Sequence, residues 1–320
     1  MDIHLLISNL TNPTLLFFIL GIIAALIKSD LEIPESSFKF ISLYLLFSIG
    51  FKGGQELQHS ALDWEILFSL IFGILISAAI PFYTFFILKR KVSISDSGAI
   101  AAAYGSVSAV TFVSAVSFIQ LQNIQFGGHM VAVMALMEFP AIIVGVILMK
   151  KYDKDADNQV SVKSIVKHSL SNGSVLMIMG SLVIGIISDS KQAEDIKPFT
   201  TDIFKGFLAL FLLEMGMTTA KRFSAFRQNG KFVFFFAILI PLINGCLVAF
   251  LSQFVTQEIG NRFIFAILAA SASYIAVPAA MRLAAPKADP GLYIPMALGV
   301  TFPFNITLGM PIYYFIIQGI

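Results

Sequence analysis

Charged side chains are scarce in this sequence. Asp, Glu, Lys and Arg make up 12% of its 320 residues, whereas 57% of the residues are hydrophobic. A soluble globular domain carries roughly 25% charged residues, so most of this chain must face lipid or other buried helices. The composition excludes an ordinary soluble domain and predicts an all-α protein that crosses a membrane many times.

Cysteine and catalytic motifs are also scarce. The single Cys246 excludes a disulfide framework or a thiolate cluster within one chain, and its apolar surroundings indicate a packing role. The sequence has no paired-aspartate motif for prenyl transfer, no Walker loop and no His-Glu-x-x-His motif, and its four histidines lie far apart. We therefore expect no enzyme, no metal or cofactor beyond a coupling ion such as sodium, and no nucleic-acid partner.

Hydrophobic runs are abundant instead. A membrane span needs about 20 mostly apolar residues, and ten such runs can be placed, at roughly 12–28, 38–57, 64–88, 95–120, 128–149, 170–188, 199–219, 231–256, 261–284 and 290–318. Most of the 21 Lys and Arg residues fall at the odd-numbered connections between these runs. The positive-inside rule puts those connections in the cytoplasm. We therefore expect a multi-pass protein of the cell's inner (plasma) membrane with both termini outside the cytoplasm.

A charged connection at 151–162 separates the chain into two halves of five expected spans, 1–150 and 163–320. Three aspartates in this connection match the opening of a calcium-binding loop. That loop also needs Gly at its sixth position and Glu at its twelfth, where this sequence has Asn158 and Ser164. We therefore interpret the segment as a solvated cytoplasmic linker.

Several sequence motifs of the first half recur in the second half in the same order. The stretch "LLFSIGFKGGQEL" aligns with "LFLLEMGMTTAKRF" through Gly50 and Gly216, and "AAAYGSVSAVTF" aligns with "AASASYIAVPAA". The motif around Pro140 matches the motif around Pro303. Because each half has an odd number of expected spans, the second half would enter the membrane in the opposite orientation. Inverted repeats are typical of secondary transporters, which alternate between inward-open and outward-open forms around a midplane site.

The matched stretches of the fourth and ninth spans contain few of the large apolar side chains that suit lipid. We expect the helix to be broken at Gly105–Ala109 and at Ser273–Val277, where small residues let backbones cross and Pro278 removes a helical donor. The half-helices after each break would present free N–H groups and positive dipole ends to an anion. Hydroxyl groups come from Ser106, Ser108, Thr111, Ser271 and Ser273. The alternative is that both stretches are small-residue seams for helix packing.

A series of short motifs runs through nearly the whole chain. In order they are "IPES" (33–36), "LLFSIGFKGG", "GSVSAVT", "MEFPA", "LEMGM", "MRLAAPKADPGLYI" and "FPFNITLGMP". In order and spacing they resemble the sodium-dependent bicarbonate transporter family of the cyanobacterial type. The resemblance implies two inverted sets of five spans, a homotrimer, a mobile core that moves against a scaffold as an elevator, and symport of sodium with bicarbonate. It also implies control by a small PII-like cytoplasmic protein, although the linker at 151–162 is shorter than in that family.

The expected substrate site lies between the two breaks. Its residues are Gly105, Ser106, Val107, Ser108, Ala109, Thr111, Ser273, Tyr274, Ile275 and Ala276. Compared with the family, Tyr274 stands in place of an acidic residue and Ala276 in place of a serine, while Ala109 replaces a glycine and Ser106 an alanine. A hard cation prefers oxygen ligands, and a neutral tyrosine hydroxyl replaces a carboxylate poorly. We therefore expect the anion half of the site to be kept and the cation half to be altered.

Polar residues inside the expected spans are candidates for ion coupling. Glu138, where the family has an aspartate, could carry a proton or bind a cation, or it could be a protonated carboxyl bonded to a neighbouring helix. Asn305, at the matched position of the tenth span, could bind an ion or link helices. The coupling-ion candidates are Glu138, Ser271, Ser273, Tyr274 and Asn305. For Glu214, pairing with the basic loop and a role in transport both stay open, whereas His129 is expected at the membrane interface.

These patterns predict a secondary active transporter of a small anion, most of all bicarbonate, and the resemblance implies sodium as the driving ion. Three alternatives stay open: another small anion, proton coupling through Glu138 or uncoupled exchange, and a transporter-derived sensor that binds without turnover. A channel is disfavoured, because channels usually build their pores from rings of subunits rather than from an inverted repeat within one chain.

Overall fold

The structure is a computed structural model that describes residues 11–59, 63–153, 167, 171, 173–226 and 230–320. Every regular element in these residues is helical, which confirms the expected all-α class. Before residue 153 these are α2 (Pro13–Leu26), α3 (Glu35–His59), α4 (Trp64–Leu88), α5 (Ile94–Gly105), α6 (Ala109–Leu121) and α7 (His129–Tyr152). From residue 154 onward, the expected linker lies outside the described residues.

The helices after the linker are more interrupted than those before it. They are α9 (Gly173–Ile187), α10 (Ser190–Asp195), the π-helical η1 (Pro198–Asp202), α11 (Phe204–Phe226), α12 (Lys231–Leu251), the short η2 (Ser252–Phe254), α13 (Ile259–Ala270), α14 (Ala276–Ala284) and α15 (Pro290–Pro295), then η3 (Met296–Thr301), α16 (Phe302–Phe304), η4 (Asn305–Gly309) and α17 (Met310–Gln318). The last five follow one another without a gap from residue 290 to 318, with π-helical turns around Pro303.

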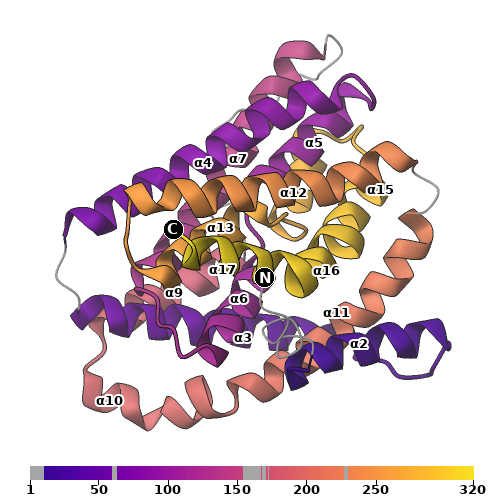
Figure 1. The fold of residues 1–320 in the computed structure, drawn as a ribbon. Helices are drawn as coiled ribbons and strands as arrows, with labels where there is room; N and C mark the ends of the chain where they lie inside the picture. Colours follow the sequence, from indigo (N-terminus) through magenta and orange to yellow (C-terminus); the bar gives the residue numbers. More distant parts are fainter. Residues whose placement is uncertain (1–10, 60–62, 154–166, 168–170, 172, 227–229) are drawn as a thin grey trace.

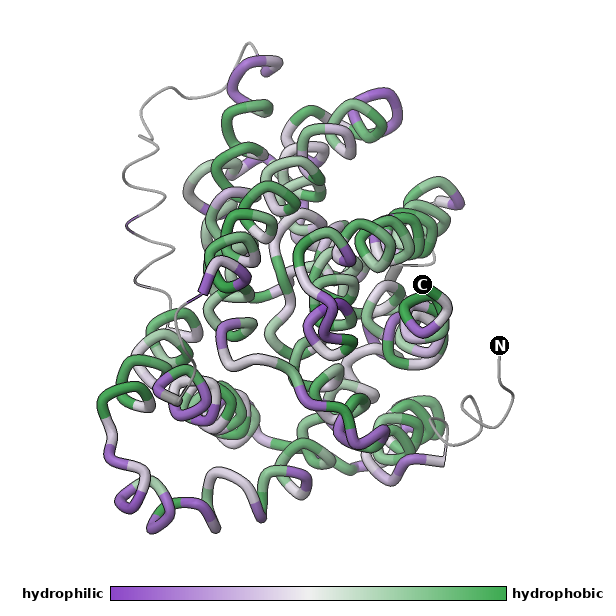
Figure 2. The backbone as a smooth tube through the Cα atoms, turned by 60° about the vertical axis from the view of Figure 1, so that its left-hand side comes forward, coloured by the Kyte–Doolittle hydropathy of each residue, from purple (hydrophilic) through white to green (hydrophobic). Residues whose placement is uncertain are grey.

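Length and composition identify six helical stretches that could cross a membrane. They are Trp64–Leu88, Ile94–Leu121, His129–Tyr152, Pro198–Phe223, Lys231–Phe254 and Pro290–Gln318. Three further apolar helices, α2, α9 and α13, are shorter. These stretches make the chain a multi-pass membrane protein. Figure 2 shows this pattern as mostly hydrophobic helical tubes with polar residues gathered at the connections between them.

Helix starts follow from capping residues in the sequence. The Asn12 side chain accepts a hydrogen bond from Thr14 N (3.0 Å), directly before the proline that opens α2. Asp63 caps α4 in the same way by accepting from Ile66 N (3.0 Å). Such side chains satisfy N–H groups that have no partner within the helix, so polar residues fix where the apolar helices begin.

The helices form two groups that lie side by side. In the peripheral group, α2 packs along α11 and α3 packs along α9; α2, α3, α10 and α11 follow one edge of the molecule in Figure 1. The central group consists of α4 to α7 and α12 to α17, with α4, α5 and α7 packed on one another and α13 against α12 and α6. Helices α5, α6 and α13 are buried along nearly their whole length. The expected site therefore lies in the middle of the central group.

The close crossings of the peripheral group depend on glycine. A Cβ at Gly216 of α11 would collide with the Phe18 carbonyl of α2, and a Cβ at Gly50 of α3 would lie 2.6 Å from the Ile178 carbonyl of α9. A side chain at either position would force the two helices apart. The two glycines that the sequence aligns thus occupy equivalent contacts in the two helix pairs.

Candidate functional site

Two non-helical junctions meet at the centre of the molecule. The first junction, 106–108, joins α5 to α6, and the second junction, 271–275, joins α13 to α14. Ser108 N donates a hydrogen bond to Ser271 Oγ (3.0 Å), and Ser273 N donates to the Ala103 carbonyl (2.8 Å). The first bond joins the two junctions and the second joins the second junction to the last turn of α5, so the structure brings the two predicted halves of the substrate site into direct contact.

The first junction contains a hydroxyl group without a partner. Ser108 caps α6, because its Oγ accepts from Thr111 N (3.2 Å). Ser106 N donates to the Ala102 carbonyl (2.9 Å), but Ser106 Oγ is fully buried and forms no hydrogen bond among the described residues. Buried polar atoms normally find partners, so an unpaired hydroxyl beside a helix N-terminus suits a ligand. Gly105 packs against the Pro81 ring of α4 and has a packing role.

The last three carbonyl groups of α13, directly before the second junction, accept side-chain hydrogen bonds. At the end of α13, Ser271 Oγ donates to the Leu268 carbonyl (2.8 Å). Asn244 Nδ2 donates to the Ala269 carbonyl (3.2 Å), and Asn305 Nδ2 donates to the Ala270 carbonyl (2.7 Å). These bonds replace the intrahelical partners that the last carbonyls of a helix lack. The end of α13 is therefore held in place by side chains from two other helices.

Asn305 and Asn244 link helices in this structure. The Asn305 Oδ1 atom accepts from the Tyr313 hydroxyl (3.3 Å), so both ends of its amide group are engaged. Of the two roles open for Asn305, its contacts are those of a helix link. Asn244, which also accepts a hydrogen bond from the Tyr83 hydroxyl, was missed by sequence reasoning. The sequence could have indicated it, because Asn244 is an amide in the middle of the apolar run of the eighth expected span.

The Tyr274 side chain points out of the second junction toward the peripheral group. Its hydroxyl lies 4.0 Å from Met215 Sδ of α11 and near the Ser108 side chain. The neighbouring Ile275 is 41% exposed and lines a cavity of about 20 Å³ together with Ala109. That volume holds about one water molecule. The other junction residues, Val107, Ser273 and Ala276, are buried.

Glu138 lies in α7 at the level of the first junction. Gly98 of α5 packs on Met149 of α7, and Ala102 packs on Gly145, so the two helices run antiparallel. Glu138 precedes Gly145 by seven residues, about 10 Å along the helix axis, which places it beside the end of α5. Among the described residues it forms no hydrogen bond or ion pair.

Two other residues singled out in the sequence lie away from the junctions. Glu214 in α11 accepts a hydrogen bond from Thr218 Oγ1 (3.1 Å) one turn away. His129, at the start of α7, is buried, and its Nε2 atom has no partner within the described part of the chain. Groups of three or more His, Cys, Asp or Glu side chains that could hold a metal ion do not occur among the described residues.

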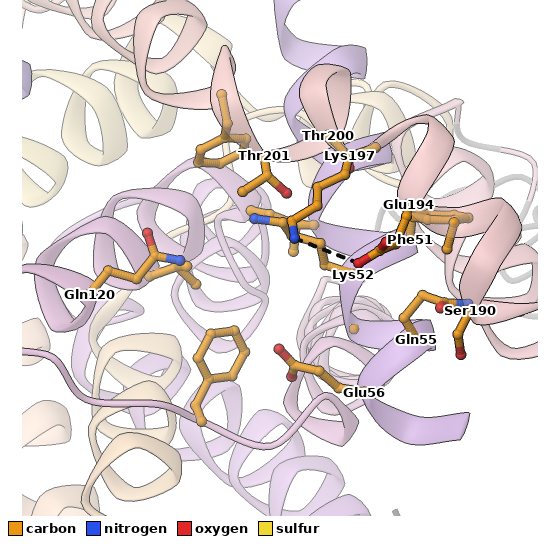
Figure 3. Close-up of a pocket in the computed structure, with 16 residues that line it drawn as sticks. Phe51, Lys52, Gln55, Glu56, Gln120, Ser190, Glu194, Lys197, Thr200 and Thr201 are labelled. Atoms are coloured by element: carbon orange, nitrogen blue, oxygen red, sulfur yellow. Dashed lines mark ion pairs between the residues drawn. The ribbon is translucent and has the colours of Figure 1, made fainter. Parts of the chain in front are cut away.

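Sequence reasoning also missed a larger cavity of about 370 Å³ between the two helix groups. We call it the Lys52 cavity; it is bounded by α3, α6, α10, η1 and the start of α11. Figure 3 shows its polar side chains, with Gln120 of α6 facing Lys52, Glu56 and Lys197 of the peripheral group. Lys52 and Glu56 lie within an expected apolar span, and this is the signal that could have indicated the cavity.

Comparison with known proteins gives one family. Residues 13–318 match the sequence model of a family described as the Na⁺-dependent bicarbonate transporter superfamily. The match covers both helix groups and both junctions. No curated protein matches the chain.

Proposed function

The chain belongs to the Na⁺-dependent bicarbonate transporter superfamily, and on this basis we propose that it is a secondary active transporter that carries bicarbonate across the cell's inner (plasma) membrane. The observation that carries the proposal is the meeting of the two junctions. There, the N-termini of α6 and α14 line one small cavity through Ala109 and Ile275, and the Ser106 hydroxyl, three residues before α6, has no partner among the described residues. Helix N-termini present free N–H groups and partial positive charge, which together suit a small anion.

We propose that the chain crosses the membrane ten times, as two inverted sets of five spans. Helices α2 to α7 would form the first set and α9 to α17 the second, each with one span broken at a junction. The equivalent contacts of Gly50 and Gly216 support this symmetry. The positive-inside rule then leaves both termini outside the cytoplasm.

Transport would follow an elevator mechanism in which the central group carries the anion past the peripheral group. The two junctions are hydrogen-bonded to each other and therefore move as one unit. Among the described residues, a small cavity beside Ile275, lined mostly by apolar side chains, separates part of the junctions from the peripheral group, and Tyr274 contacts α11. The family resemblance implies that the protein would assemble as a homotrimer and that a PII-like cytoplasmic protein would regulate it.

Family membership favours sodium as the driving ion. A sodium site needs several oxygen ligands, and two candidates at the second junction, Ser271 Oγ and Asn305 Oδ1, already have hydrogen-bond partners. Tyr274 points toward α11 instead of replacing the missing carboxylate. Glu138 is therefore the residue that we assign to coupling, as an oxygen ligand for sodium or, in a second version, as a proton carrier.

The test is uptake of isotope-labelled bicarbonate into proteoliposomes with an inward sodium gradient, with a proton gradient, and with neither. We expect uptake that depends on sodium, and we expect Tyr274→Asp to strengthen that dependence. Uptake that responds only to a proton gradient would support the role of Glu138 as a proton carrier. Saturable binding without uptake under any gradient would overturn transport and indicate a sensor.

A further inference from the structure

The helix α6 lies along α3 in a defined register. In the small cavity, Ala109 and Val110 face Leu45 and Leu46. In the Lys52 cavity, Val116 and Gln120 line the wall opposite Ile49, Lys52 and Glu56. Residue numbers on both helices increase together, so the two helices run in the same direction. The first junction therefore lies at the level of Leu45, and Lys52 lies seven residues further, about 10 Å along α3.

The face of α6 that meets α3 is made of small and medium apolar side chains. Ala109, Val110, Val113 and Val116 follow one another at helical spacing and end at Gln120. No charged residue lies on this stripe. Such a face can shift along its neighbour without breaking an ion pair.

The ammonium group of Lys52 is held at the wall of its cavity. Lys52 Nζ lies 5.9 Å from the centre of the Phe204 ring, and the negative charges of Glu56 and Asp202 act on it. Lys197, which lines the same cavity from the peripheral group, pairs with Glu194 (3.9 Å). By contrast, Lys52 forms no ion pair within the described part of the chain, and although Glu56 and Asp202 act on its charge, its ammonium group can still attract an anion.

We propose that Lys52 is a binding residue for the transported anion in the second conformation of the transport cycle. If the central group moves about 10 Å along α3, the first junction leaves Leu45 and Leu46 and enters the Lys52 cavity. The anion carried between the junctions then contacts the Lys52 ammonium group. The cavity has room for it, since its 370 Å³ equals the volume of roughly ten water molecules. This inference rests on the proposed transport function and adds a fixed residue of the peripheral group to the anion site.

The first experiment measures bicarbonate uptake by the full chain in proteoliposomes as a function of external bicarbonate. Lys52→Met is expected to raise KM about 10-fold or more, the effect of losing one charged hydrogen bond, while Lys52→Arg keeps KM within about threefold. The matched control, Lys197→Met, removes the paired lysine of the same cavity and is expected to change KM less than twofold. An unchanged KM in Lys52→Met overturns the inference and leaves transport standing, whereas absence of uptake by the natural chain overturns the transport function itself.

The second experiment tests the movement and does not depend on uptake. Cys246 is the chain's single cysteine, so a Cys246→Ser background allows defined thiol pairs. The pair Lys52→Cys with Val110→Cys is expected to be joined by a short bifunctional thiol reagent, although the two residues lie about two turns apart here. The pair Leu46→Cys with Val110→Cys, which faces the small cavity, serves as the positive control. Cross-linking of the control pair alone, in the presence and absence of bicarbonate and sodium, overturns the proposed contact.

Discussion

The two junctions differ in how completely their polar groups are satisfied. Directly before the second junction, the last three carbonyl groups of α13 accept hydrogen bonds from Ser271, Asn244 and Asn305. At the first junction, the buried Ser106 Oγ has no partner among the described residues. A buried polar group without a partner costs free energy, so it persists where a ligand completes it. The difference teaches that the first junction carries an unsatisfied hydroxyl, whereas side chains from two other helices hold the end of α13 next to the second junction.

Glu138 and Asn305, which stand at matched positions in the sequence, also differ in whether their polar groups have partners. Asn305 is fully buried and bonded at both ends to α13 and α17. Glu138 is a carboxyl in α7 with no charged partner within the described residues. Asn305 is therefore a neutral amide that links helices, whereas Glu138 carries a carboxyl group that can bind or release a cation.

The largest expected effect comes from neutralising Glu138. Glu138→Gln is expected to lower sodium-driven bicarbonate uptake about 100-fold, because it removes a charge that takes part in coupling at about 3 kcal/mol. The thermal unfolding temperature in detergent should stay within a few degrees of that of the natural protein. Glu214→Gln, which alters a carboxylate bonded only to Thr218, is the control and should change uptake less than twofold. Equal losses in both variants would contradict a special role for the first junction.

A smaller effect, on stability rather than transport, is expected at the second junction. Asn305→Leu removes the donor to the Ala270 carbonyl and the acceptor of the Tyr313 hydroxyl. We expect a loss of about 2 kcal/mol in the free energy of unfolding, measured by denaturation in detergent. Asn244→Leu should give a loss of similar size. If Asn305→Leu kept its stability and lost sodium dependence instead, Asn305 would be an ion ligand and the contrast between the junctions would fail.

The smallest effect should appear at Ser106. Ser106→Ala deletes a hydroxyl with no protein partner, so stability should change by less than about 0.5 kcal/mol, while the affinity for bicarbonate falls about threefold. Ser271→Ala is the matched serine of the other junction and should behave in the opposite way, losing about 1 kcal/mol of stability because two hydrogen bonds disappear. Titration of bicarbonate binding beside thermal unfolding separates the two outcomes. A stability loss in both serine variants would mean that both junctions are structural.

Hydropathy was sufficient to predict an all-helical membrane protein, because the apolar runs exceed what a soluble chain can bury. The sequence also indicated where small residues gather, and α5 ends at Gly105 and α13 ends at Ala270 within those stretches. It could not indicate which polar atoms there are satisfied. The partners of the α13 carbonyls come from residues 25 and 35 positions away, and the direction of the Tyr274 side chain depends on how α11 packs. Such contacts depend on the register between helices, which a local sequence pattern does not determine.

The paired hydrogen bonds of the junctions also have a consequence for synthesis. Ser108 N finds its partner 163 residues later in the chain. At about 5–20 residues per second, that partner is made roughly ten to thirty seconds after Ser108 itself. Until then the first half has inserted helices whose central turn lacks its hydrogen-bond partner. The first junction therefore reaches the hydrogen bonding of this structure only after the second half of the chain has been made.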